Sequence, residues 1–184
     1  KKIKIFTENS NNKEILKFED QKDNLFSILQ NQKIFNQLII ELKKSKFFKF
    51  KKYIKYRKSD YLSYDLIINC DIRNEITKRY FSKKFEKEYN SIAFTTIIDH
   101  IKLSSNNEAI QIFTNDGPIA FLPISNEKTS IVYSARMKKY KTESEINKII
   151  NKFNPKYEIK KIHKFSKFDL KSINLREYYK DNIL

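Results

Sequence analysis

The stretch that most constrains the fold of this chain runs from Asn115 to Arg136 and contains its only glycine and two of its three prolines. Asn115-Asp116-Gly117 is a turn signal, and Pro118 has no N–H, so it belongs at the first residue of a strand or on a sheet edge. An apolar run at 119–124, a polar turn at 125–128 and a β-branched run at 129–135 follow. This pattern predicts a β-hairpin with one buried face.

The length and composition predict a folded protein with a core of its own. The chain has 184 residues, of which 40% are hydrophobic, so it is one large domain or two small ones. No run approaches the ~20 apolar residues of a membrane span, and no apolar segment of a signal peptide follows Lys1. We therefore expect a cytoplasmic protein. A single cysteine and two histidines permit neither an internal disulfide nor a zinc cluster, so we expect no metal site.

The formal net charge of +16 raises the question of a polyanionic partner. The basic residues are spread from end to end, which is typical of a solvated lysine surface, and we expect no nucleic-acid partner. The densest block, Lys43 to Lys58, is interleaved with phenylalanine and tyrosine, which stack on bases in some proteins. A basic non-enzymatic module that binds nucleic acid or a membrane surface is therefore the alternative function. Peripheral contact with an anionic membrane surface also stays open.

Residue periodicity and turn signals predict an α+β fold. At least three antiparallel strands are expected between Ser91 and Ala135, and Thr142 is expected to cap a helix that Asn154-Pro155 ends. The other predicted elements are a hairpin at 1–18, an amphipathic helix at 34–44, two strands within 47–64, a buried strand at 65–69, a short helix within 74–85, a helix at 143–153, a last strand at 157–165 and a polar, aromatic tail at 168–184.

The chain contains no nucleotide-binding loop, zinc-protease motif or nucleophile elbow. His100 follows Asp99, but adjacent residues of a strand point to opposite faces, so the two are not expected to cooperate. His163 lies beside lysines and is a weaker candidate still. Cys70 ends an apolar run and is expected to be an inert core thiol. We therefore assign no catalytic residue.

Four segments carry a family resemblance. They read I-L-Q-N-Q-K-I-F-N-Q-L at 28–38, D-L-I-I-N-C-D-I-R-N-E-I-T-K at 65–78, G-P-I-A-F-L-P-I at 117–124 after Tyr89 to His100, and F-D-L at 168–170 before Tyr178 to Leu184. They resemble the central part of the FAD-dependent aromatic-ring monooxygenases of the para-hydroxybenzoate hydroxylase type. The closest resemblance is to ubiquinone-biosynthesis hydroxylases of the 2-octaprenyl-6-methoxyphenol hydroxylase kind. The corresponding family motifs are V-V-E-N-R, D-L-V-V-G-A-D-G-x-x-S-x-x-R and Y-x-x-x-A…G-P-x-A-L-L-P-L.

The chain departs from this family at several positions. Gln32 stands where the family has arginine, Ile72 where it has glycine, Glu75 for serine, Lys78 for arginine and Asp169 for proline. A β-branched residue does not readily take the positive φ that glycine permits, so the loop after Asp71 is expected to differ. The family's dinucleotide fingerprint and its G-D-A-A-H motif are not in this sequence, and we expect an internal fragment of a longer hydroxylase.

The resemblance implies four segments that belong to two kinds of domain. Residues 1–20 would be strands of the substrate region, and residues 21–88 a partial FAD-binding domain with a degenerate Asp-Gly-type motif. Residues 89–165 would form the antiparallel sheet and helix of the substrate domain. Residues 166–184 would return to the FAD-binding domain.

The resemblance also implies a function for the parent protein. It would hydroxylate a phenolic, prenylated ubiquinone precursor with FAD, NAD(P)H and O2, and other ubiquinone-biosynthesis proteins would be partners. The implied cofactor-binding residues are Gln32, Asp71, Gly117 and Pro118. The implied substrate-binding residues are Ala120, Leu122 and Pro123. The fragment alone is expected to be inactive.

Overall fold

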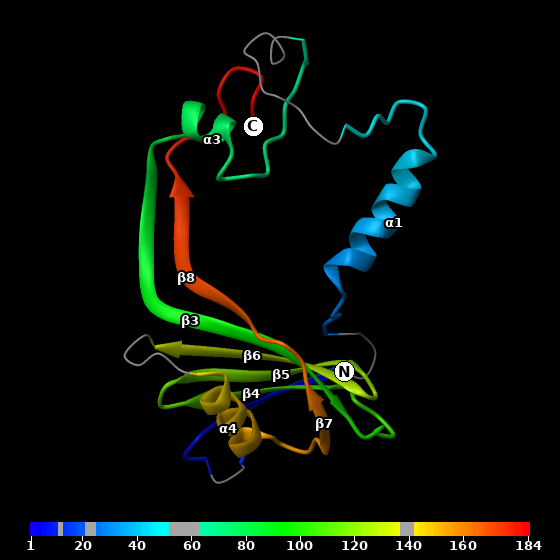
Figure 1. The fold of residues 1–184 in the computed structure, drawn as a ribbon, viewed down its shortest axis with the longest axis vertical. Helices are drawn as coiled ribbons and strands as arrows, with labels where there is room; N and C mark the ends of the chain where they lie inside the picture. The colour runs from blue at the N-terminus through cyan, green and yellow to red at the C-terminus, as the bar shows by residue number, and fades with distance from the viewer. Residues whose placement is uncertain (11–12, 21–24, 52–62, 137–141) are drawn as a thin grey trace. The chain divides into compact units, whose positions relative to one another are not determined.

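The computed structural model describes residues 1–184 except 11–12, 21–24, 52–62 and 137–141 (Figure 1). Its described residues form two compact units. Unit 1 comprises Lys1–Ile34 and Asn90–Leu170, and unit 2 comprises Phe35–Tyr89 and Lys171–Leu184. No helix in the described ranges has the length and apolar character that crossing a bilayer requires.

Unit 1 is built on a mixed sheet. Along the sheet the strands run β2-β1-β4-β5-β6-β3-β7, and β8 also pairs with β3. The predicted antiparallel pairing between Ser91 and Ala135 is confirmed, because β3–β6, β4–β5 and β5–β6 are all antiparallel. The sheet as a whole is mixed, since β1 lies parallel to β4. The strands are β1 Lys2–Thr7, β2 Leu16–Glu19, β3 Lys84–His100, β4 Glu108–Thr114, β5 Gly117–Ser125, β6 Lys128–Arg136, β7 Ile159–Ile162 and β8 Ser166–Leu175.

The hairpin predicted from the turn residues is confirmed on both sides of β5. Thr114 pairs with Gly117, so Asn115 and Asp116 form the tight β4–β5 turn, and the Thr114 hydroxyl donates to the Gly117 carbonyl at 2.6 Å. β5 returns as β6 through Asn126 and Glu127. Pro123 is the last regularly paired residue of β5, because the register shifts between it and Ser125. Such a shift accommodates a residue that cannot donate to the ladder.

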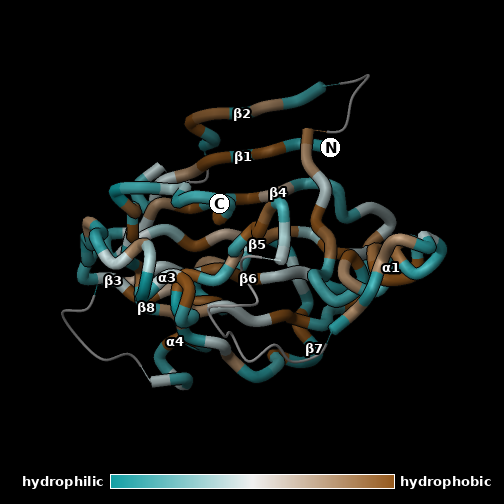
Figure 2. Tube along the Cα trace, turned by 90° about the horizontal axis from the view of Figure 1, so that it is seen from above, coloured by the Kyte–Doolittle hydropathy of each residue, from teal (hydrophilic) through white to brown (hydrophobic). Residues whose placement is uncertain are grey.

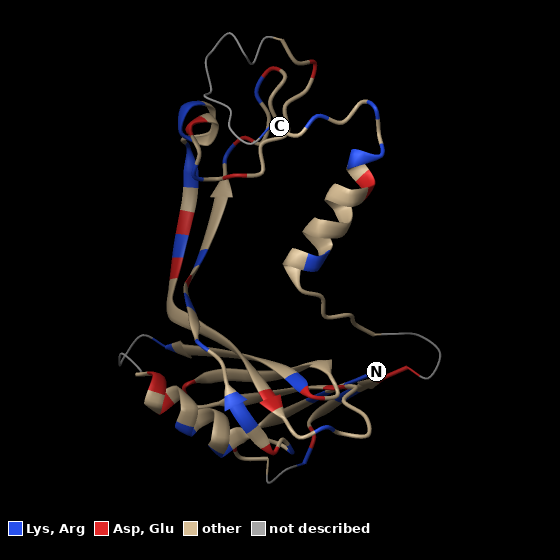
Figure 3. Ribbon diagram, turned by 45° about the vertical axis from the view of Figure 1, so that its right-hand side comes forward, with Lys and Arg blue, Asp and Glu red and all other residues tan. Residues whose placement is uncertain are grey.

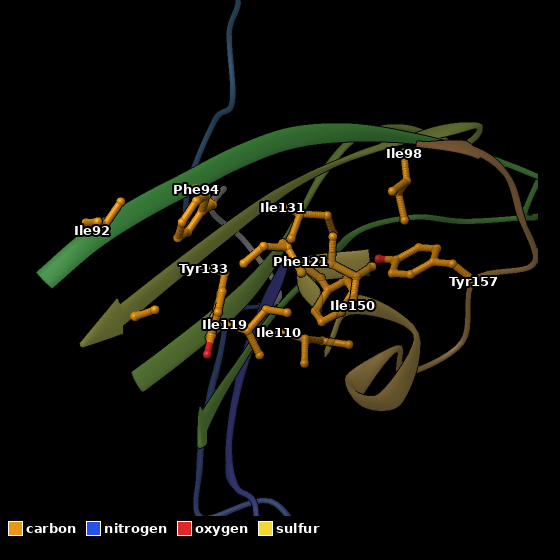
Figure 4. Close-up of a cluster of buried hydrophobic side chains, with 12 residues drawn as sticks. Ile92, Phe94, Ile98, Ile110, Ile119, Phe121, Ile131, Tyr133, Ile150 and Tyr157 are labelled. Atoms are coloured by element: carbon orange, nitrogen blue, oxygen red, sulfur yellow. The ribbon is translucent and has the colours of Figure 1, made fainter. Parts of the chain in front are cut away.

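A helix and one face of the sheet enclose the core of unit 1. The helix α4, Glu143–Phe153, begins with the predicted Thr142 cap, and the Glu145 backbone and side chain complete a capping box. Ile146 and Ile150 of α4 are 1% and 0% exposed and belong to the same core cluster as side chains of the sheet. Figure 4 shows Ile150 beside side chains of the sheet. The sheet contributes the buried side chains Ile92, Phe94, Ile98, Ile110, Ile119, Phe121, Ile131, Tyr133 and Ala135.

Unit 2 has a small core of its own around the short helix α3, Glu75–Tyr80. Its buried side chains are Ile76, Phe81 and Ile183, with Ile67 packed against them. The predicted buried strand from Asp65 to Asn69 is wrong. Within 65–69, Ile67 makes the one β-bridge, to Ile183, and its neighbours Leu66 and Ile68 are 58% and 65% exposed, so they are not held in a buried strand.

Two further predictions meet different outcomes. The amphipathic helix is confirmed as α1, Asn31–Lys43. The tail at 168–184 is wrong in part, since its first residues belong to β8. Of the two strands predicted within 47–64, residues 52–62 lie outside the described ranges, and the flanking residues 47–51 and 63–64 are not in strands.

The chain passes from one unit to the other at three places. The sequence places boundaries after residues 20, 88 and 165, and the units change at 34/35, 89/90 and 170/171. The middle boundary lies beside Asn90, which has a φ of 49°, a value that asparagine tolerates better than most residues. The assignment of the units to substrate and flavin-binding domains stays a prediction.

Gly117 is predicted to be essential for stability. Its φ is +139°, and an added Cβ would lie 2.0 Å from the Ser134 carbonyl oxygen of β6. Gly117→Ala is therefore expected to lower the free energy of unfolding by about 1–3 kcal/mol or more, through backbone strain and displacement of β6. Urea denaturation of the 184-residue chain measures this. The control is Glu127→Ala in the β5–β6 turn, and equal stability of the two variants would contradict the explanation.

The β1–β2 hairpin is predicted to loosen in acid. Hydrogen bonds from Lys17 and Lys2 lower the pKa of Glu19 from 4.5 to about 2. Because the folded-state pKa is the lower one, this stabilisation is complete above pH 4.5 and is lost as the pH falls toward about 2. Amide exchange in β1 and β2 should accelerate over that interval. In Glu19→Gln, which is already unpaired, the pH dependence of this exchange should be smaller, and an identical profile would contradict the prediction.

Candidate functional site

The side chains of β5 alternate between two environments. Ile119, Phe121 and Pro123 are buried in the core that α4 covers. Pro118, Ala120 and Leu122 are only partly buried and point to the opposite side, which we call the outer face. The structure therefore divides the predicted substrate-binding set. Ala120 and Leu122 share the outer face, whereas Pro123 lies on the core face and cannot join them.

The outer face extends across six strands. In one row, the registers place Leu16 beside Ile5, Ile5 beside Gln111, Gln111 beside Ala120, Ala120 beside Val132 and Val132 beside Thr95. A second, shorter row joins Leu122, Ser130 and Ile97. These rows are mostly aliphatic, and their polar members, Gln111, Thr95 and Ser130, are uncharged. Figure 2 shows the hydropathy along the strands of the sheet.

The charges of the β1–β2 hairpin lie on the other side of the sheet. Lys2 pairs with Glu19 at 2.6 Å, and Lys4 pairs with Glu108 at 3.0 Å. Because side chains alternate, the intervening apolar residues of both strands fall on the outer face. Leu16 and Phe18 of β2 remain 53% and 49% exposed. The outer face is therefore an apolar surface of the kind that commonly marks a binding site.

Gly117 is the first residue of β5, and its missing side chain has a structural explanation. The space that a Cβ would fill is occupied by the Ser134 carbonyl of β6, so it is not open to a ligand. Pro118 pairs with Phe113 of β4 and is partly buried. The cofactor contacts that the resemblance implies for both residues stay predictions.

The loop around Asp71 is held together by its own hydrogen bonds. An Asp71 carboxylate oxygen accepts from the Arg73 backbone N–H at 2.9 Å, and the Asp71 carbonyl accepts from the Thr77 hydroxyl at 2.7 Å. Asn74 caps α3 and donates to Asn69 at 2.6 Å. The Asp71 carboxylate, which the resemblance assigns to the cofactor, therefore stabilises its own loop.

A small cavity lies beside this loop. Its volume is about 220 Å³, below the about 300–1,000 Å³ of usual small-molecule sites. Its lining residues include Asn69, Ile72 and Thr77. Gln32, the fourth predicted contact, is an exposed residue of α1 in unit 1, whereas Asp71 belongs to unit 2. This cavity is therefore too small to hold a flavin dinucleotide by itself, and the cofactor contacts implied for Gln32 and Asp71 stay predictions.

An ion pair that the sequence did not predict lies at one edge of the outer face. His163 Nε2 is 2.8 Å from an Asp99 carboxylate oxygen, and Lys128 Nζ is 3.2 Å from the other. The hydrogen bond from His163, with help from Lys128, lowers the pKa of Asp99. Asp99 alternates with the buried Ile98 and His100, which places the pair on the outer face. The alternation of residues in β3 predicts the face on which Asp99 lies. It does not predict the pairing with His163, which is 64 residues away in the chain.

His100 belongs to a buried network on the core side. Its Nε2 lies 3.1 Å from the Thr129 hydroxyl, which also accepts from Asn106 at 3.0 Å, and the Tyr157 hydroxyl donates to Asn106 at 3.1 Å. Burial raises the pKa of Tyr157, so its hydroxyl stays protonated. The network satisfies buried polar groups, and the prediction that His100 and Asp99 do not cooperate is confirmed.

Cys70 is exposed, so the prediction of a buried core thiol is wrong, because the run before it is not a buried strand. Within the described ranges, no cluster of histidine, cysteine, aspartate and glutamate side chains could hold a metal ion.

Comparison with known proteins gives likenesses in structure only. No family model matches the sequence, and no curated protein matches it. The flavin-dependent halogenase CmlS superposes with a TM-score of 0.47 at 12% identity, over 64% of this chain and 24% of CmlS. A flavin-dependent halogenase from Xanthomonas campestris gives 0.48 at 7% identity, over 65% of this chain and 24% of that protein. Tetracycline destructase Tet(51) gives 0.42 at 13% identity, over 65% and 36%. This chain thus spans well under half of each neighbour, and the activities named are properties of those proteins.

The two faces of β5 are predicted to differ in their contribution to stability. Phe121→Ala, in the core, should lower the free energy of unfolding by about 3–5 kcal/mol. Its neighbour Leu122, on the outer face, keeps part of its surface in solvent, so Leu122→Ala should cost less than about 1.5 kcal/mol. Urea denaturation of both variants measures the difference. Equal losses would show that the outer face is packed like a core.

Proposed function

We propose that the outer face is the substrate-facing wall of a flavin-dependent monooxygenase that hydroxylates an apolar phenolic compound. The proposal takes its reaction class from the sequence resemblance to aromatic-ring hydroxylases. The observation that carries it is the uncharged, mostly aliphatic surface that crosses the sheet around Ala120 and Leu122. A ubiquinone-type precursor with a prenyl chain is the substrate class we favour, because both its parts are largely apolar.

In this proposal the described residues bind and orient the substrate. Leu122, Val132 and Ile97 supply apolar contacts and exclude water. Gln111 and Thr95, on either side of the Ala120–Val132 pair, supply uncharged hydrogen-bonding groups for a ring hydroxyl. The flavin, when reduced by NAD(P)H, would supply the oxygen activation, so this face needs no ionisable catalyst.

The proposal places flavin binding on protein outside these 184 residues. The space beside Gly117 is filled by β6, the Asp71 carboxylate is engaged in its own loop, and the cavity beside that loop is small. The isolated 184-residue chain should therefore purify without flavin. An absorbance spectrum with stoichiometric bound flavin would contradict this assignment.

The test of function uses the longest reading frame that contains this chain. Leu122→Asn should raise the KM for the phenolic substrate about tenfold or more and uncouple NAD(P)H oxidation from hydroxylation, because one apolar contact is lost and water enters. Rates are normalised to folded, flavin-loaded protein.

The matched control is Leu29→Asn, at a position that is 65% exposed. This variant should keep the KM and the coupling of the unsubstituted protein. A Leu122→Asn enzyme with the kinetics of the control would remove the outer face from the substrate site. Absence of any phenol-dependent NAD(P)H oxidation in the unsubstituted protein would overturn the proposed function.

A further inference from the structure

We infer that unit 2 carries a binding surface for membranes that contain anionic phospholipids. The surface consists of Phe47, Lys49, Lys51, Tyr64 and Leu66, and we call it the basic–aromatic surface. Together with Ile67 these residues line an open hollow of about 670 Å³. The inference stands independently of the proposed function, because it rests on residues outside the sheet.

Large apolar side chains of this surface are exposed to an unusual degree. Phe47 is 85% exposed and Leu66 is 58% exposed, while Phe50, next to the surface in sequence, is 61% exposed. Side chains of this size normally bury most of their area in a folded protein. Phenylalanine and leucine beside lysine are the composition with which peripheral proteins enter the headgroup region of a bilayer.

Most of the charges near these side chains in sequence are positive, and Asp65, between Tyr64 and Leu66, is an acidic exception. Lysines occupy positions 43, 44, 46, 49 and 51, and Glu41, the acidic residue of this segment, is bound by Lys44 at 2.8 Å. Lys46 lies 5.1 Å from the centre of the Phe47 ring, and Lys51 Nζ is 3.3 Å from the Tyr64 hydroxyl. Cations held beside aromatic rings complement an anionic lipid surface, where charge and apolar matter also lie side by side.

The helix α1, which precedes this surface in the chain, shows the same composition. It is amphipathic, and none of its side chains is buried. Phe35, Leu38 and Leu42 follow a helical spacing of three and four residues, and each is exposed by 43–56%. Lysines mark both ends of the helix (Figure 3). A helix of this kind lies flat in a membrane interface.

The aliphatic residues distinguish a membrane from a nucleic acid. Phenylalanine and tyrosine could stack on bases, but Leu66 of the surface and Leu38 and Leu42 of α1 have no planar face to offer. No arginine, the side chain best suited to bidentate phosphate contacts, occurs among the described residues 31–51 and 63–67. The exposed area therefore favours insertion among lipids.

Vesicle co-sedimentation of the 184-residue chain tests the inference. The chain should bind vesicles of phosphatidylcholine mixed with phosphatidylglycerol in equal parts, and high salt or phosphatidylcholine alone should abolish binding. Lys49→Gln/Lys51→Gln should weaken partitioning about 25-fold, since each lysine near an anionic surface contributes about fivefold. Phe47→Ser/Leu66→Ser should also weaken it, by loss of the inserted side chains.

Matched controls lie elsewhere in the chain. Lys160→Gln/Lys161→Gln removes the same charge from exposed positions of β7, and Phe85→Ser/Phe168→Ser removes side chains that are 63% and 55% exposed. Both should bind vesicles like the unsubstituted chain. Three results would each overturn the inference. They are no binding to anionic vesicles, equal losses of vesicle binding in the test and control variants, and self-association of the chain through Phe47 and Leu66 without vesicle binding. Tight binding of a single-stranded oligonucleotide without vesicle binding would establish the nucleic-acid alternative instead.

Discussion

The two-sided character of β5 is the constraint on which both layers of unit 1 depend. Its odd-numbered residues Ile119 and Phe121 meet Ile150 of α4, and its even-numbered residues Ala120 and Leu122 build the outer face. A shift of one residue in the pairing of β5 would exchange the two sets. The close approach of Gly117 to β6, which leaves no room for a Cβ, holds that register at the start of the strand.

The core of unit 1 is formed on the face of the sheet that α4 covers, so the side chains of the outer face are not needed to build it. Most buried side chains of unit 1 lie on the α4 side of the sheet. Substitutions on the outer face should therefore change the surface without disturbing that core. The same separation explains the position of charge, since Lys2, Lys4, Glu19 and Glu108 gather on the α4 side of the sheet edge. The outer face is thus mostly aliphatic around Ala120 and Leu122, and its charged groups, Asp99 with Lys128 and His163, lie at one edge.

Sequence signals predicted the elements that local residues determine. The Asn115–Gly117 turn, the Thr142 capping box and the periodicity of α1 each lie within a few residues and were read correctly. Contacts between distant residues were not predictable, and they account for the errors. The parallel β1–β4 pair, the extension of the tail into β8 and the single bridge from Ile67 to Ile183 all depend on partners far along the chain. In the candidate site, β5 was identified, but the separation of Pro123 from Leu122 and the Asp99–His163 pair needed the sheet itself.

Unit 2 is assembled from two stretches of chain, and this affects the order in which a ribosome lets the protein fold. Residues 35–89 leave the ribosome early, but their core includes Ile183, and the Asn69 N–H donates to the Leu184 carbonyl at 2.7 Å. During synthesis, domains ordinarily complete from the N-terminus onward. Here the strands of unit 1 from β1 to β7 can pair first. The core of unit 2 cannot be completed until residues 171–184 have been synthesised. The early half of unit 2 therefore stays accessible to chaperones until residues 171–184 have been synthesised.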